Sequence, residues 1–126
     1  MKVRRIYSDS GGRTRMEWRE VPLDGSERPT SPALPVSSVF FREQPEGHVH
    51  GRHNAPRRQI IIVVSGTGEI ELPDGGRWRF GPGAVMFAEN TTGEGHVTHT
   101  LEGVRTFAYL PMPDSFDITR WPLADD

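Results

Sequence analysis

The 126-residue chain contains no cysteine, so it can form neither a disulfide bond nor a thiolate metal site. This absence is typical of a reducing compartment, and we expect a cytoplasmic protein. No apolar run is long enough to cross a bilayer, and the first ten residues are too polar for a secretory leader. We therefore expect no membrane partner. The formal net charge of −2 argues against nucleic acid as a partner.

The sequence also lacks a sustained apolar period of 3.6 residues, which excludes a mainly helical protein. Instead, 14 glycines and 11 prolines divide it into short segments. This pattern predicts an all-β barrel or jelly roll in one domain, residues 1–126. We expect a strand-and-loop lead-in over 1–35, a barrel over 36–110 and a tail over 111–126. The tail either packs as an irregular cap or crosses to a partner subunit.

The strongest strand signal is the unbroken β-branched run from Gln59 to Val64. A strand that is apolar on both sides must be covered on both faces. The glycines of Ser65–Gly68 predict a hairpin turn into an alternating strand over Glu69–Leu72. Pro73–Gly76 predicts a second hairpin turn.

Further strands are predicted wherever alternating or β-branched segments lie between turn residues. They cover Val3–Tyr7, Thr14–Arg19, Val36–Glu43, Arg77–Phe80, Ala84–Ala88, His96–Leu101 and Val104–Leu110. In the segment His48–Pro56, His48 and His50 share parity, but the glycine and asparagine predict an irregular backbone over Gly51–Ala55.

All five histidines fall within two short stretches, His48–His53 and His96–His99. Neutral imidazole is the commonest nitrogen ligand for transition metals. Residues of equal parity share one face of a strand, so Gln59 should point the same way as Ile61 and Val63. By the same rule Thr98 and Thr100 should point the same way as His96, whereas His99 should point elsewhere unless a bulge intervenes.

Two motifs carry a family likeness. Gln59 and Gly66 are separated by six residues, and His53 stands six residues before Gln59. Gly81-Pro82-Gly83 then opens a strand, and His96 follows the loop after it. Together with HNAPRRQ and ENTTGEGH, these motifs make residues 36–110 resemble the cupin superfamily, in particular small conserved-barrel cupins without an assigned function. The resemblance implies a double-stranded β-helix, or jelly-roll barrel, with a ligand pocket into which Gln59 and His96 point.

The resemblance also implies a divalent transition metal (Fe, Zn, Ni or Mn), held here by His53, Gln59 and His96. Ala55 replaces the family's second histidine, and Gln59 replaces its carboxylate. This set should bind a metal more weakly than a carboxylate set. Gln59 has a second possible role, hydrogen bonding to a substrate carbonyl or hydroxyl. The family habit, together with the need to cover the central strand, predicts a homodimer.

The remaining site residues are expected around this set. His96 and Glu89 are the candidate acid–base pair, although Glu89 could equally be a surface carboxylate. Arg57 or Arg58 could reach the pocket mouth and hold a carboxylate. The substrate-binding candidates are His50, Arg57, Trp78 and His99.

Three functions remain open at this point. The first is a metal-assisted enzyme of isomerase, lyase or dioxygenase type that acts on a small polar oxygenated metabolite in the barrel. The second is a metal-free barrel that binds or senses a small molecule. The third is a domain whose strands mainly mediate dimerisation. Fold resemblance alone does not separate them.

Overall fold

The computed structural model describes residues 1–126, which form strands and one short 3-10 helix. The strands are β1 (Lys2–Ser8), β2 (Thr14–Glu20), β3 (Phe40–Gln44), β4 (Val49–His53), β5 (Gln59–Ser65), β6 (Gly68–Glu71), β7 (Arg77–Phe80), β8 (Val85–Ala88), β9 (His96–Thr100), β10 (Arg105–Pro111) and β11 (Leu123–Ala124). The 3-10 helix η1 (Ile118–Arg120) lies in the C-terminal tail. No helix is long and apolar enough to cross a membrane.

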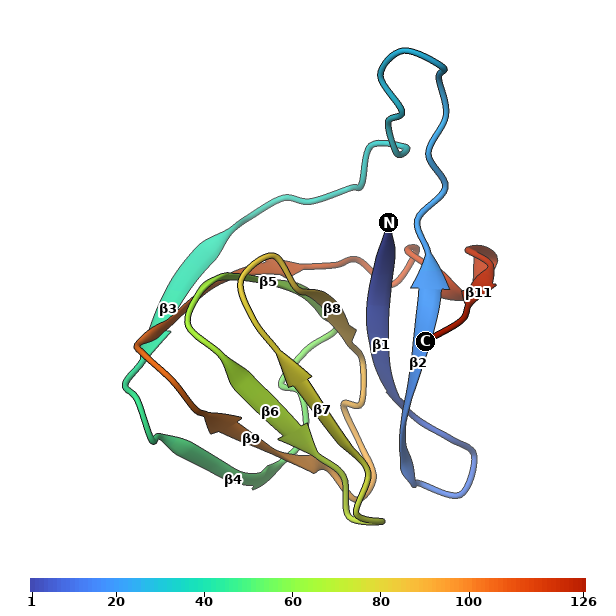
Figure 1. The fold of residues 1–126 in the computed structure, drawn as a ribbon. Helices are drawn as coiled ribbons and strands as arrows, with labels where there is room; N and C mark the ends of the chain where they lie inside the picture. The colour runs from blue at the N-terminus through green and yellow to red at the C-terminus, as the bar shows by residue number, and fades with distance from the viewer.

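The strands form two sheets that face each other (Figure 1). The larger sheet has the order β11-β2-β1-β8-β5-β10-β3, and the smaller has the order β4-β9-β6-β7. Every neighbouring pair is antiparallel except β1 and β8, which run parallel. The predicted all-β jelly-roll architecture is confirmed, with β5 inside the larger sheet between β8 and β10.

One of the two predicted hairpins is wrong. β5 pairs with β8 and β10, whereas β6 pairs with β7 and β9, so Ser65–Gly68 connects the two sheets. The glycines favour a sharp turn, but they do not specify whether the strands on either side pair. Pro73–Gly76 does form a hairpin, in which the Leu72 amide donates to the Gly76 carbonyl at 2.8 Å.

Two strands were not predicted from the sequence. β4 forms within His48–Pro56 because β9 offers it a pairing edge, and its register shifts between His50 and His53. This irregularity accommodates the glycine within the strand. β11 is a two-residue edge strand on β2, formed by the tail. At β3, pairing begins at Phe40, four residues after the predicted start at Val36.

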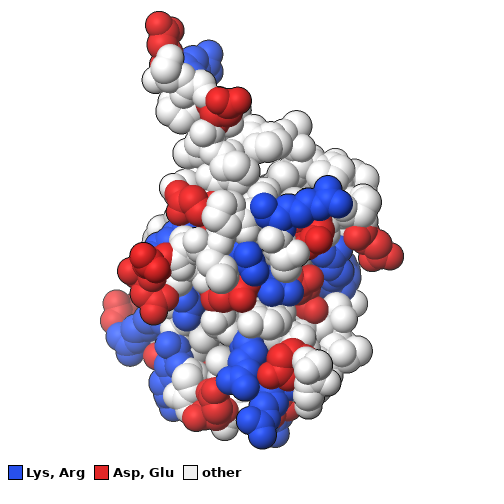
Figure 2. All heavy atoms as spheres, turned by 90° about the vertical axis from the view of Figure 1, so that its right-hand side faces the viewer, with Lys and Arg blue, Asp and Glu red and all other residues white.

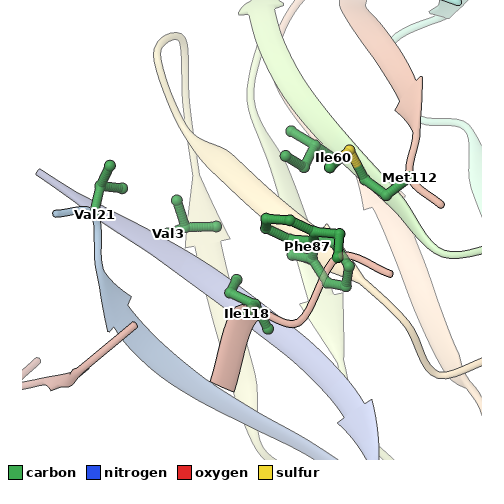
Figure 3. Packing of buried hydrophobic residues seen from close by; sticks show 7 residues of the cluster. Val3, Val21, Ile60, Phe87, Met112 and Ile118 are labelled. Carbon is green, nitrogen blue, oxygen red and sulfur yellow. The ribbon is translucent and has the colours of Figure 1, made fainter. Parts of the chain in front are cut away.

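Hydrophobic clusters lie on both faces of the larger sheet. The inner cluster, between the sheets, includes Ile6, Val63 and Met86. The outer cluster includes Ile60 and Phe87, and the tail covers it with three apolar side chains (Figure 3). These are Met112, Phe116 and Ile118. The tail therefore packs as a cap.

This packing bears on the expected dimer. The chain's own tail covers Ile60 and Ile62 on the outer face of β5, whereas Val64 on the same face is 56% exposed. The tail therefore supplies only part of the outer cover. The homodimer stays a prediction.

Basic side chains at the amino-terminal end are matched by nearby carboxylates. Figure 2 shows basic and acidic groups interspersed on the side of the molecule that carries β1 and β2. Glu17 accepts from Arg5 at 3.0 Å and from Arg19 at 2.6 Å, and Asp9 accepts from Arg15 at 3.0 Å. The residues between β2 and β3 project from the body as a loop (Figure 1).

Candidate ligand-binding site

A cavity of about 100 Å³ lies between the two sheets and is lined by residues from both. Its apolar wall comes mainly from the larger sheet and includes Ile61, Met86 and Phe107. Its polar lining consists of His50, His53, Gln59, His96, Thr98, Arg42, Gln44, Arg57, Arg105 and Tyr109. No aspartate or glutamate lines the cavity.

Strand parity places the predicted residues. Gln59 and Ile61 line the cavity from β5, and Gln59 is only 3% exposed. On β9 the side chains of His96, Thr98 and Thr100 are buried, as their shared parity predicted. The alternation also turns His99 away, and its Nε2 lies 3.5 Å from Glu71 on the neighbouring strand β6.

Two imidazoles meet inside this cavity. The His53 and His96 rings lie 4.5 Å apart between centroids. His53 Nδ1–H donates to the Gly51 carbonyl at 2.8 Å, so its Nε2 is left as a free acceptor. Asn90 Nδ2 donates to His96 Nδ1 at 2.8 Å, so the proton of neutral His96 sits on Nε2, a free donor. His50 stacks on His53 with a ring separation of 3.4 Å.

Burial keeps this histidine cluster neutral. Burial, with smaller contributions from the neighbouring His53 and His50, lowers the pKa of His96 to about 3. Burial also lowers the pKa of His53 and of His50. At neutral pH the cluster therefore offers uncharged donors and acceptors.

Gln59 is held by a cation. Arg57 Nη1 donates to Gln59 Oε1 at 3.0 Å, and the Arg57 guanidinium lies 5.5 Å from the centre of the Phe40 ring. The amide oxygen that would ligate a metal thus already faces a positive charge.

The donor set does not fit a tightly held divalent metal. No group of three or more His, Cys, Asp or Glu side chains is arranged to hold an ion. The free nitrogen of His96 carries a proton, and the oxygen of Gln59 faces Arg57. A cavity that contains arginines and no carboxylate also disfavours a cation on charge grounds. The metal stays a prediction that these contacts do not favour.

Three residues expected at the site do not line the cavity. Glu89 pairs with Arg5 at 2.5 Å and with Arg58 at 3.3 Å, so its carboxylate is committed to a structural network. Trp78 packs edge-on against Trp18 with centroids 5.6 Å apart. These two residues and His99 are absent from the cavity lining, so the structure does not assemble the expected His96–Glu89 pair there.

The two adjacent arginines diverge. Arg57 lines the cavity, whereas Arg58 donates to the Pro113 carbonyl at 2.9 Å and to the Phe116 carbonyl at 2.5 Å. Arg58 therefore fastens the tail. The sequence could not show which of the two arginines faces the cavity, because the direction of each side chain depends on where β5 begins.

Sequence reasoning missed Arg42, Asn90, Arg105 and Tyr109. Arg42 carries no motif, and only the register of β3 against β10 brings it into the cavity. Asn90 is fully buried, although it lies in a segment whose polar composition suggests an exposed loop. For Arg105 and Tyr109, a signal was available in the shared parity with Phe107 along the predicted strand.

The strand order of the two facing sheets is that of a jelly roll. No family model and no curated protein sequence matches the chain.

Solved structures of similar shape include SPY1581, a conserved protein of unknown function from Streptococcus pyogenes, at 19% identity and a TM-score of 0.48. That match covers 61% of this chain and 65% of the other, a little under two thirds. KdgF from Halomonas sp. matches at 23% identity and a TM-score of 0.46 over 86% of this chain and 87% of the other. NovW, a 4-keto-6-deoxy sugar epimerase from Streptomyces spheroides, matches at 13% identity and a TM-score of 0.44 over 92% and 71%. At these values the likeness carries no argument about activity.

Proposed function

We propose that this protein binds a small oxygenated metabolite in the cavity without a metal. The observation that carries the proposal is the pairing of two neutral imidazoles, one with a free acceptor and one with a free donor. A hydroxyl group both donates and accepts, so it can donate to His53 and accept from His96. The apolar wall around Ile61 and Met86 matches a short carbon skeleton.

A ligand screen by NMR tests this binding. In ¹H–¹⁵N spectra of labelled protein, glycerol, erythritol, lactate and pyruvate are added in turn. We expect at least one compound to shift signals of cavity residues, including the His96 imidazole. The double variant His53→Ala/His96→Ala should keep the fold and lose the response. The matched control His99→Ala changes a histidine of the same strand outside the cavity, and it should keep the response. The site assignment is wrong if the ligand-induced shifts persist in the double variant, or if they are lost in His99→Ala as well as in the double variant.

The metal-assisted enzyme is the competing proposal. One observation favours it, namely that the His53 Nε2 lone pair is free, as a ligand nitrogen must be. Elemental analysis of protein purified without a nickel column decides between the two. We expect no stoichiometric Fe, Zn, Ni or Mn. We also expect no change in Tm after a chelator is added, because a chelator lowers Tm only when it removes an ion bound to the folded protein. Stoichiometric metal would overturn the metal-free proposal.

Proton transfer is a second function that His53 could perform. Its free Nε2 can accept a proton, whereas the pKa of about 3 makes His96 a poor base at neutral pH. An enzyme of isomerase type would then use His53 as base and His96 as hydrogen-bond donor to the substrate oxygen. Any ligand found in the screen is incubated in D₂O with the protein. Deuterium incorporation that requires His53 but tolerates His99→Ala supports catalysis, and its absence leaves a binding protein.

A further inference from the structure

Arg105 is a buried cation without a partner. It is 6% exposed, its Nε has no hydrogen-bond partner, and it belongs to no ion pair of the protein. Its guanidinium lies 4.1 Å from the centre of the Phe107 ring and 5.6 Å from that of Phe80. Aromatic faces hold a guanidinium in place but do not neutralise it. Buried charges are normally paired, so this one indicates a missing anion.

The strand register directs Arg105 into the cavity. Arg105, Phe107 and Tyr109 alternate along β10, and all three line the cavity. Gln44 of β3 lies directly opposite Arg105, and it lines the cavity as well. The unpartnered guanidinium is therefore part of the cavity wall and is available to a ligand.

Two further arginines line the same cavity at exposed positions. Arg42 of β3 stands opposite Phe107 and lies 5.0 Å from the centre of the Tyr109 ring. Arg57 lies over Phe40 and donates to Gln59. Neither forms an ion pair, and no carboxylate lines the cavity to balance the three positive charges. Positive charge at the mouth of a cavity attracts anions toward the site within it.

We propose that the cavity takes a small organic acid, whose carboxylate is held by Arg105. The planar fork of a guanidinium fits a carboxylate in two parallel hydrogen bonds. A cavity of about 100 Å³ restricts the ligand to a short acid. The inference rests on the proposed function and deepens it: Arg105 holds the carboxylate, while His53 and His96 contact another oxygen of the same molecule.

Calorimetry and thermal shifts with defined probes test this anchor. The carboxylates are lactate, pyruvate and malonate, the neutral counterparts are lactamide and malonamide, and the competing oxyanions are inorganic phosphate and sulfate. We expect at least one carboxylate to bind and raise Tm, while its amide does not. Arg105→Met should weaken that binding roughly tenfold or more, because a charge-assisted pair is lost.

The control variant is Arg79→Met, which removes an exposed arginine of β7 that lies 3.5 Å from Glu69. It should leave carboxylate binding unchanged. Arg105→Met should also leave the Tm of the ligand-free protein unchanged or raise it, because it removes an uncompensated buried charge. A purely structural Arg105 would instead lower this Tm when replaced. The inference fails if no carboxylate binds or if Arg105→Met keeps full affinity. Binding of phosphate or sulfate alone overturns the carboxylate assignment.

The two proposals fail in distinguishable ways. In the first case a neutral hydroxylated compound binds, its binding is lost in His53→Ala/His96→Ala, and its binding is kept in Arg105→Met. The proposed function then holds and the acid inference is wrong. In the second case carboxylate binding is lost in Arg105→Met but kept in the double histidine variant, so the acid inference holds and the role of the imidazole pair is wrong.

Discussion

His96 shows how its surroundings define the chemistry of a residue. Its imidazole is 5% exposed, and Asn90 holds its Nδ1. A histidine on the surface would gain a proton near pH 6.5. Here burial excludes the charged form, and the hydrogen bond from Asn90 fixes which nitrogen carries the single proton. The side chain therefore serves as a donor toward the cavity.

The lowered pKa of His96 makes stability depend on pH in a defined window. The pKa is about 3 in the folded protein and about 6.5 when unfolded, so between these values only the unfolded state binds the proton. The free energy of unfolding should fall as the pH falls through this window and should be fully present above it. Between about pH 7 and about pH 5, the free energy of unfolding of the wild type should fall by about 2 kcal/mol more than that of His96→Gln.

Urea unfolding of the two proteins at both pH values measures this difference. Carboxylates that titrate in the same range cancel, because both proteins carry them. An equal loss in the wild type and in His96→Gln would show that the buried imidazole does not control the pH response.

At the scale of elements, the link between β5 and β6 depends on close backbone approach. Gly66 has φ +77°, and a Cβ at this position would lie 2.6 Å from the Val104 carbonyl oxygen. Any other residue would meet both an unfavourable backbone conformation and a clash with backbone that cannot move aside. This turn carries the chain from one sheet to the other.

Gly66→Ala should therefore destabilise the protein more than a glycine replacement of equal backbone strain. Gly103 is the matched control, with φ +74° and no atom within 4 Å of an added Cβ. Gly103→Ala should cost about 1 kcal/mol, which is the strain alone, and Gly66→Ala should cost roughly 3 kcal/mol or more. Chemical denaturation measures both. An equal loss in the free energy of unfolding in both variants would show that the backbone around Gly66 relaxes to accommodate the added Cβ.

At the scale of the whole molecule, the larger sheet separates two apolar regions. The inner region contributes apolar side chains to the wall of the ligand cavity, and the tail packs against the outer region. Arg58 ties this tail to the body through two carbonyl groups and the Glu89 carboxylate. The tail thereby covers the Ile60 and Ile62 part of the outer face of β5, whereas Val64 of the same strand stays exposed.

The tail should consequently be an integral part of the folding unit. Ile118 is 1% exposed in the outer cluster, whereas Leu123, a few residues later, is 65% exposed. We expect Ile118→Ala to cost about 2–4 kcal/mol in the free energy of unfolding and Leu123→Ala less than about 0.5 kcal/mol. Both are read from urea unfolding curves. A cost for Ile118→Ala as small as for Leu123→Ala would show that the tail packs independently of the sheet.

The sequence by itself determined the all-β class, most of the strands and which residues share a strand face with Gln59 and with His96. These follow from local properties, namely β-branched composition, turn residues and the two-residue alternation of a strand. Tertiary structure decided which strands pair, and therefore where the chain crosses between sheets and which histidines meet. It also paired Glu89 with Arg5 and Arg58 and placed no carboxylate beside Arg105, because ion pairs form between residues far apart in the chain. The charge of the cavity, and with it the expected ligand, depends on these distant pairings.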